Sequence, residues 1–220
     1  MPLAPNQPIL CYVTDRKALG SRGPAFGAGL IESIREARKV GVDWVQLREK
    51  DMGARELLAL TKEAVAVAGR TKIIVNDRLD VAVTGGASGV HLGGESIPAA
   101  DVIRWCRAGN VQEGFLIGVS CHSLEDVRRA EAEGADYIFF GPVFDTPAKR
   151  KFGAPQGLER LAELCLGRRV PVIAIGGVNE ENAHDCIRAG AAGIAAIRFF
   201  QERRGDAALQ KVIARLHGGA

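Results

Sequence analysis

The stretch KIIVNDR, residues 72–78, joins a short apolar run directly to three polar residues. A run such as Ile-Ile-Val requires a dry environment, so it predicts a buried strand. A second stretch, GVHLGGES at residues 89–96, repeats the pattern after a short amphipathic segment. Apolar runs that are nearly continuous are typical of parallel strands covered on both faces. The two stretches therefore predict strand–helix units whose polar strand ends meet at one edge of a parallel sheet.

The same pattern extends along the whole chain. Eight runs predict strands, at Ile9–Asp15, Val42–Leu47, Lys72–Asn76, Gly89–Leu92, Phe115–Ser120, Tyr137–Val143, Val172–Gly176 and Gly193–Ile197. Amphipathic segments predict helices over Leu30–Lys39, Ala54–Ala68, Leu79–Val83, Ala99–Arg107, Leu124–Glu133, Leu158–Cys165, Glu180–Ala189 and Ala207–Leu216. On the second of these helices, Leu57, Leu58, Ala64, Val65 and Ala68 are expected to share the buried face. Eight strand–helix units predict an α/β protein with a single-domain (β/α)8 TIM barrel over residues 1–220, with a doubly wound open sheet as the alternative.

Composition excludes several classes of protein. The chain has 220 residues, 47% of them hydrophobic, and a formal net charge of +3. No stretch combines clustered Lys or Arg with stacking aromatics, and no apolar run approaches the length of a membrane span, so neither nucleic acid nor a membrane is expected as a partner. The N-terminus MPLAPNQP lacks the features of a secretory signal. The five scattered cysteines form no CxxC pair, which favours reduced thiols and a cytoplasmic location.

The residues that follow the strands are rich in cations. In a TIM barrel these residues gather at the C-terminal rim, where catalytic sites are built. A concentration of cations with few acids indicates a polyanionic ligand, and the expected set is Arg48, Lys50, Arg78, Lys149, Arg150, Lys151 and Arg198. The segment IGGV, residues 175–178, is expected to open a helix through Asn179 and to hold a phosphate by its backbone N–H groups.

Two rim residues are candidates for more specific chemistry. Asp77 is a candidate Mg²⁺ ligand beside phosphates, or else the partner of Arg78 or Lys50 in an ion pair. His122 is a candidate general acid or base, or else a polar residue beside a helix that Ser123 caps. Both pairs of alternatives are open at the level of the sequence.

Six motifs together resemble the thiamine phosphate synthase family, in the same order from about residue 9 to residue 200. They are QLREK (46–50), NDR (76–78), VHLG (90–93), GVSCH (118–122), GPVF (141–144) with Thr146 and Lys149, and AIGGV (174–178). The resemblance implies a TIM barrel and a transferase of thiamine biosynthesis, with small phosphorylated molecules as partners. Hydroxymethylpyrimidine diphosphate would join hydroxyethylthiazole phosphate by a dissociative displacement that releases diphosphate and uses Mg²⁺.

The resemblance also implies roles for individual residues. Catalytic roles would fall to Lys149, Ser120 and His122, and metal binding to Asp77 and Glu95. Substrate contacts would come from Gln46, Arg48, Glu49, Lys50, Asn76, Ser120, Thr146, Lys149, Gly177, Ile197 and Arg198. Of these, Thr146 and Gly177, with the Ile197–Arg198 backbone, would hold the thiazole phosphate.

The chain departs from the family pattern at three positions. Ser96 stands where the family has a second Mg²⁺-binding Asp, and Glu95 could substitute for it; Ala148 replaces a Thr and Arg198 a Ser. These departures keep two alternatives open. One is a related thiazole tautomerase that moves a proton with His122, and the other is a non-catalytic regulator that binds thiamine precursors. The intact segment at residues 46–50 favours the synthase, because a tautomerase has no evident need of it.

Overall fold

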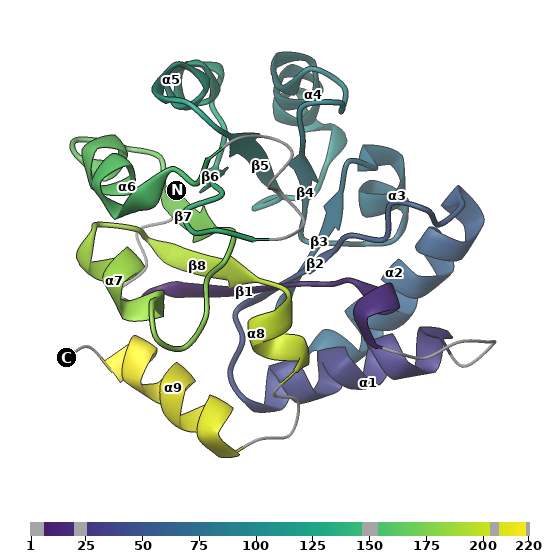
Figure 1. Ribbon diagram of the computed structural model, residues 1–220. Coiled ribbons are helices and arrows are strands. Elements are labelled where there is room, and N and C mark those ends of the chain that lie inside the picture. The colour runs from purple at the N-terminus through teal and green to yellow at the C-terminus, as the bar shows by residue number, and fades with distance from the viewer. Residues whose placement is uncertain (1–6, 20–25, 147–153, 203–206, 219–220) are drawn as a thin grey trace.

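Eight parallel strands form a closed barrel. The computed structural model describes residues 7–19, 26–146, 154–202 and 207–218. Each strand pairs with the next along the chain, and β8 closes the ring onto β1 (Figure 1). The strands are β1 (Ile9–Val13), β2 (Trp44–Leu47), β3 (Lys72–Asn76), β4 (Gly89–Leu92), β5 (Leu116–Cys121), β6 (Tyr137–Phe140), β7 (Val172–Ile175) and β8 (Gly193–Ala196). The predicted TIM barrel is confirmed.

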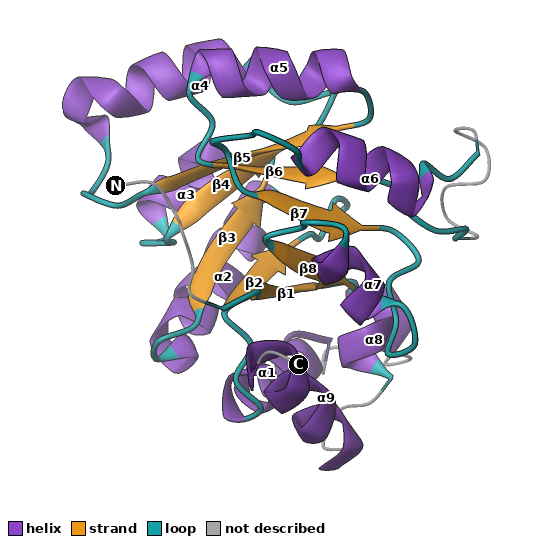
Figure 2. Ribbon diagram, turned by 90° about the vertical axis from the view of Figure 1, so that its left-hand side faces the viewer, coloured by secondary structure: helices purple, strands orange, loops and turns teal. Residues whose placement is uncertain are grey.

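Helices surround this barrel on its outer side, as Figure 2 shows. They are α1 (Phe26–Lys39), α2 (Ala54–Ala68), α3 (Leu79–Thr84), α4 (Ala99–Trp105), α5 (Leu124–Glu133), α6 (Gly157–Cys165), α7 (Ala183–Arg188), α8 (Arg198–Gln201) and α9 (Ala207–Gly218). A 3-10 helix, η1 (Arg16–Leu19), follows β1, and a π-helical turn, η2 (Cys106–Asn110), extends α4. Within the described ranges, no helix is both long enough and apolar enough to cross a membrane.

Two hydrophobic cores meet at the strands. The larger core lies between the strands and the helices, and a smaller one fills the inside of the barrel with side chains such as Trp44, Tyr137 and Phe139. Gly118 makes room for this filling, since a Cβ atom there would lie 2.0 Å from the ring of Tyr137. The lower part of the barrel is therefore packed solid, and space for a ligand is left at the C-terminal ends of the strands.

The buried face of α2 differs in part from the expectation. Leu57, Ala64 and Ala68 are buried as predicted, but Val65 is 36% exposed and Leu58 only half-buried. Their places in the core are taken by Leu60, Thr61 and Val67. The buried stripe follows the spacing i, i+3, i+4, i+7 from Leu57 strictly, and this spacing turns positions 58 and 65 towards solvent.

The segment after β7 also differs from the expectation. The helix begins at Ala183 instead of Glu180, because the side chain of Asn179 caps a turn. Its Oδ1 atom accepts hydrogen bonds from the backbone N–H groups of Glu181 (2.9 Å) and Asn182 (3.2 Å). Two glycines and a turn, not a helix end, therefore face the rim at this point.

Candidate functional site

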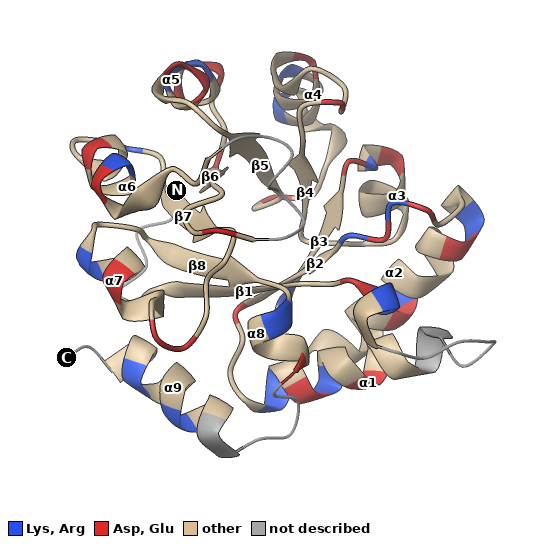
Figure 3. Cartoon of the chain, viewed as in Figure 1, with Lys and Arg blue, Asp and Glu red and all other residues tan. Residues whose placement is uncertain are grey.

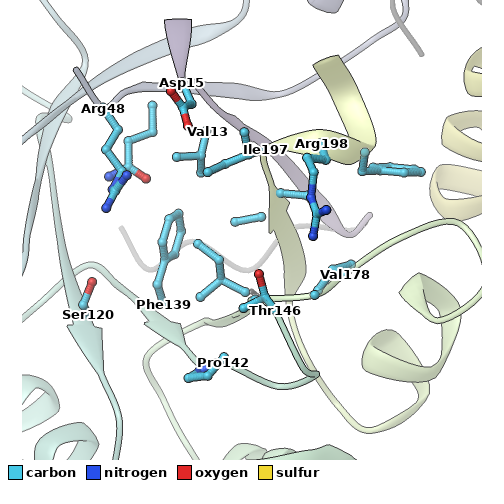
Figure 4. A pocket seen from close by; sticks show the side chains of 18 of the residues that line it. Val13, Asp15, Arg48, Ser120, Phe139, Pro142, Thr146, Val178, Ile197 and Arg198 are labelled. Atoms are coloured by element: carbon cyan, nitrogen blue, oxygen red, sulfur yellow. The ribbon is translucent and has the colours of Figure 1, made fainter. Parts of the chain in front are cut away.

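A cavity of about 810 Å³ opens at the C-terminal ends of the strands. Figure 4 shows Arg48 and Ser120 on one side of it and Thr146, Val178 and Arg198 on the other. Most of the expected site residues line this cavity: Gln46, Arg48, Lys50, Asn76, Asp77, Ser120, His122, Thr146, Gly177, Ile197 and Arg198. Lys149, with Arg150 and Lys151, lies outside the described residues. Glu49 and Glu95 are described but are not among the residues that line the cavity.

One side of the cavity is lined by Gln46, Asn76, Asp77 and Gly93, and these residues with Ser96, which is hydrogen-bonded to Asp77, are here called the Asp77 corner. The register of β3 against β4 pairs Asn76 with His91, so the two polar strand ends adjoin as the sequence predicts. Asp77 has φ of 62°, a left-handed conformation that is uncommon for a residue with a side chain. Its Oδ1 atom accepts hydrogen bonds from the Gly93 N–H (3.2 Å) and from the Ser96 hydroxyl. The backbone bend thus holds the carboxylate against the loop after β4.

A directed chain of hydrogen bonds runs through this corner. A carboxylate can only accept, so the Asn76 Nδ2 atom donates to Asp77 Oδ2 (2.5 Å). The Oδ1 atom of Asn76 is then turned to accept from Gln46 Nε2 (2.8 Å). The chain ends at Gln46 Oε1, which is buried and has no hydrogen-bond partner among the described residues. The chain therefore leaves one buried acceptor without a partner at its far end.

These oxygen atoms suit Mg²⁺ in one particular mode of binding. The described residues contain no cluster of three or more His, Cys, Asp or Glu side chains that could hold a metal on its own. Mg²⁺ usually takes only one or two protein carboxylates and completes its shell with water and substrate phosphates. The Asp77 carboxylate fits that mode. Glu95 is exposed, and it is Ser96, not Glu95, that reaches Asp77.

The ion-pair alternative for Asp77 is not what the structure shows. Arg78 turns to Asp80, with its Nε atom 2.9 Å from Asp80 Oδ1, and this contact lowers the pKa of Asp80 although partial burial opposes it. Among the ion pairs of the described residues, none includes Asp77. Its carboxylate thus remains available to a ligand cation.

The opposite side of the cavity, here called the glycine corner, consists of Thr146, Gly176, Gly177, Ile197 and Arg198. The two glycines have φ of 95° and 69°, which favours glycine over any other residue. At Gly177 a Cβ atom would lie 2.7 Å from the carbonyl oxygen of Asp145, so the two chain segments touch. The short helix α8 begins at Arg198, immediately after β8. Loops after the seventh and eighth strands form the usual phosphate site of this fold.

The charge at the rim differs from the expectation. Among the described residues that line the cavity, the cations are Arg48, Lys50 and Arg198, and the carboxylates are Asp15, Asp77, Asp145, Glu180, Glu181 and Glu202. Figure 3 shows acidic and basic positions interspersed around the strand ends. The predicted excess of cations is therefore wrong for this part of the chain. Sequence order revealed the cations, but it did not show which loops turn their acids towards the cavity.

Two histidines also line the cavity, one at its floor and one near its mouth. His91 is 2% exposed, and burial lowers its pKa to about 3, so the ring is neutral. His122 is exposed, and its Nδ1 atom is hydrogen-bonded to the carbonyl oxygen of Gly141. A carbonyl only accepts, so Nδ1 carries a proton and donates it to this bond. Ser123 caps α5, as expected, by accepting from the Asp126 N–H (3.1 Å).

Glu49 has a different place from the one expected for a substrate contact. It is 5% exposed. It accepts a hydrogen bond from the Thr14 hydroxyl (2.6 Å) and forms an ion pair with Arg16 (2.9 Å). Thr14 Oγ1 in turn accepts from the backbone N–H of Arg48 (3.0 Å). Glu49 is therefore not among the residues that line the cavity, and its contact with substrate stays a prediction. Glu49 instead ties the loop after β1 to the loop that carries Arg48.

Comparison with known proteins gives consistent matches along the chain. A family model described as "Thiamine monophosphate synthase" matches residues 10–200. A putative thiamine-phosphate synthase of Geobacter sulfurreducens is 42% identical over 190 residues, covering 86% of this chain and 84% of that protein. The thiamine-phosphate synthase of Roseiflexus castenholzii is 37% identical over 199 residues, covering 90% of this chain and 82% of that protein.

A solved structure agrees with these sequence matches. The thiamine phosphate pyrophosphorylase of Pyrococcus furiosus superposes with a TM-score of 0.76 and 33% identity, over 96% of this chain and 94% of that one. A 3-hexulose-6-phosphate synthase, at 17% identity and a TM-score of 0.67, shares the fold alone. On the matched family model and these relatives, the chain belongs to the thiamine monophosphate synthase family.

Proposed function

We propose that the protein is a thiamine-phosphate synthase, a transferase that joins hydroxymethylpyrimidine diphosphate to hydroxyethylthiazole phosphate. The observation that carries the proposal is the presence of two different polar corners in one cavity. Arg48 and Lys50 adjoin the Asp77 corner and suit a diphosphate, while the glycine corner suits a single phosphate. Two phosphorylated substrates need two such places on opposite sides of the reacting atoms.

The reaction makes one bond and breaks one. The bond between the pyrimidine methylene carbon and the diphosphate oxygen breaks, and diphosphate leaves with the electron pair. The thiazole ring nitrogen then donates its lone pair to the methylene cation and forms the new C–N bond. Groups that stabilise the departing negative charge accelerate such a step, because that charge develops in the transition state.

Residues in and beside the Asp77 corner would bind the diphosphate and balance its charge. Arg48 and Lys50 supply positive charge, and Asn76 and Ser120 supply hydrogen bonds. Asp77 would hold Mg²⁺ together with oxygen atoms of the diphosphate. When bound, that ion would supply additional positive charge at the leaving group. Lys149 is assigned to the same group by its place in the family motif, and it lies outside the described residues.

The second corner and the floor have separate tasks. Thr146 and the backbone at Gly177 and Ile197–Arg198 would hold the thiazole phosphate, and Arg198 would add a charge of its own. Phe139 lies on the floor, with its ring centroid 4.2 Å from that of His91. A floor of packed rings leaves little room for water, which would otherwise capture the methylene cation.

The test is an assay of both substrates with Mg²⁺, in which diphosphate release and thiamine phosphate formation are measured together. The proposal expects equal amounts of the two products. Diphosphate release without thiamine phosphate, or neither product, would contradict it.

One observation favours a second candidate, thiazole tautomerase activity. His122 lines the cavity, and because its Nδ1 atom is hydrogen-bonded to the Gly141 carbonyl, Nε2 is the ring nitrogen left for proton transfer. Proton exchange on thiazole phosphate that disappears in His122→Ala, without diphosphate release, would select this function. Binding of both precursors without either activity would indicate a regulator. Against the tautomerase stands the Gln46–Asn76–Asp77 chain, which proton transfer on thiazole phosphate does not need.

We further propose a reducing, cytoplasmic setting. All five cysteines are free, and four of them are buried. Burial raises the pKa of the Cys121 thiol to about 12, which leaves it protonated and unreactive at neutral pH.

A further inference from the structure

Three side chains from neighbouring strands meet at the floor of the cavity: His91 on β4, Ser120 on β5 and Tyr137 on β6. The register pairs His91 with Gly118 and Gly118 with Tyr137. Because Gly118 has no side chain, the ring of Tyr137 occupies the space above it, where a Cβ atom would lie 2.0 Å from the ring. The phenol thereby passes across β5 and reaches His91.

The contacts form a short line that ends at the cavity. The Tyr137 hydroxyl lies 3.2 Å from His91 Nδ1, and His91 Nε2 lies 2.9 Å from Ser120 Oγ. Tyr137 is 0% exposed and packs against Trp44, with ring centroids 4.7 Å apart. His91 and Ser120 both line the cavity. The line therefore connects the packed interior of the barrel with the substrate.

Only one arrangement of protons satisfies every group on this line. If Nδ1 carries the proton, it donates to Tyr137, and the buried phenol proton then has no acceptor among the described residues. If Nε2 carries the proton, the phenol donates to Nδ1 and Nε2 donates to Ser120 Oγ. A buried donor without an acceptor is costly, so the second arrangement is favoured. The neutral state of the ring agrees with the burial that lowers the pKa of His91 to about 3.

We propose that Tyr137 and His91 are positioning residues that hold Ser120 as a hydrogen-bond donor to the substrate. Ser120 Oγ uses a lone pair to accept from His91, which leaves its O–H free to donate into the cavity. The group that accepts this hydrogen bond is on the pyrimidine diphosphate, either a ring nitrogen or a phosphate oxygen. The inference rests on the proposed function for the identity of that substrate, but not for the proton arrangement.

The proton arrangement can be measured without any substrate. In protein labelled with ¹⁵N-histidine, the ring nitrogens of His91 are identified by the signals that disappear in His91→Gln. The proposal expects a proton on Nε2 and a bare Nδ1 at neutral pH. In Tyr137→Phe the phenol proton is gone, and a mixture of the two tautomers is expected. A wild-type protein with the proton on Nδ1 would overturn the proposal.

A double-mutant cycle tests whether the line acts through Ser120. Ser120→Ala is expected to lower kcat/KM by about 10- to 100-fold, and Tyr137→Phe by about 2- to 10-fold. Because Tyr137 acts only through Ser120, the double variant should be no slower than Ser120→Ala. Fully additive losses would overturn the proposal.

The control is Tyr12→Phe, which removes another buried phenol hydroxyl, since Tyr12 is 1% exposed and does not line the cavity. Its kcat/KM should stay within about twofold of the wild type. If the wild-type protein releases no diphosphate while Nε2 carries the proton, the proposed function fails and the proton arrangement is supported.

Discussion

The Asp77 corner and the glycine corner are built by different means. The first is made of side chains, with a carboxylate, two amides and a hydroxyl joined by hydrogen bonds. The second depends on the backbone, with φ of 95° and 69° at two adjacent glycines. A side-chain site fails when one functional group is removed, whereas a backbone site fails when one atom is added. Substitutions of opposite kind therefore test the two corners.

The largest effect is expected from Asp77→Ala. Loss of the carboxylate removes the proposed Mg²⁺ ligand, so kcat should fall by about 100-fold or more, equivalent to about 2.7 kcal/mol. The measurement is diphosphate release across a Mg²⁺ titration. Asp80→Ala is the matched control, because Asp80 is a neighbouring carboxylate that pairs with Arg78 and does not line the cavity. Turnover in Asp77→Ala equal to that of the control at every Mg²⁺ concentration would refute the metal assignment.

A methyl group added at the glycine corner should lower both the stability of the protein and its affinity for thiazole phosphate. In Gly177→Ala the new Cβ atom would lie 2.7 Å from backbone oxygen and 2.7 Å from Phe144 Cβ. We expect a loss of about 1–3 kcal/mol in the free energy of unfolding and a KM for thiazole phosphate about tenfold higher. Urea unfolding and steady-state kinetics measure the two effects.

Gly167→Ala separates strain from contact in that experiment. Gly167 has φ of 70°, close to that of Gly177, but a Cβ atom there would meet nothing within 4 Å. In this variant the free energy of unfolding should fall only by the cost of an alanine in a left-handed conformation, and KM should not change. Equal effects in the two variants would mean that the close approach at Gly177 is unimportant.

Acid should lower the free energy of unfolding through His91, which lies at the floor of the cavity. His91 has a pKa of about 3 when folded, against 6.5 for an unburied histidine, so the unfolded chain binds a proton that the folded protein does not. The contribution of His91 to stability is complete above pH 6.5 and is lost as the pH falls from there towards 3. Between pH 7.5 and pH 5 the loss amounts to about 2 kcal/mol. Urea unfolding in metal-free buffer measures it.

His91→Gln provides the reference, because glutamine can hydrogen-bond but does not titrate. The unfolding free energy of the wild type minus that of the variant should therefore be lower at pH 5 than at pH 7.5, by the same amount. A difference that stays constant from pH 7.5 to pH 5 would show that His91 does not titrate as its burial implies.

The smallest effect is expected at Ser96. Ser96→Asp would place a second carboxylate beside Asp77, and two neighbouring carboxylates bind a divalent cation more tightly than one. Calorimetry with inorganic diphosphate present should show Mg²⁺ affinity raised about tenfold, or about 1.4 kcal/mol. Ser96→Asn has the same shape without the charge and should show no gain. Equal affinities for the two variants would contradict the idea.

The difference between the corners also explains what could be predicted from the sequence. The barrel and the residues of the Asp77 corner follow from apolar runs that end in polar residues, and KIIVNDR shows this directly. The sequence pattern does not predict the direction in which a side chain at the rim points. Glu49 and Arg48 are adjacent, yet one is tied to Thr14 and Arg16 and the other lines the cavity. That choice depends on partners 33 to 35 residues away.

Short and aperiodic elements were also missed. The helix η1 and helix α8 each have four residues, too few to show a helical period. The contact of Ser96 with Asp77 is hidden from the sequence for a similar reason, because it spans 19 positions and depends on the bend at φ of 62°. Local pattern could identify the strand ends but not the contacts between loops.

The unpartnered oxygen of Gln46 has a consequence for the order of the whole corner. The Asp77 carboxylate fixes the direction of both amides, so Gln46 cannot turn its N–H group away from Asn76 without breaking the chain. A buried acceptor that lacks a donor costs about 1–3 kcal/mol. The carboxylate thus keeps a neighbouring amide in an orientation that the amide alone would not favour, and its removal would free both amides to rotate.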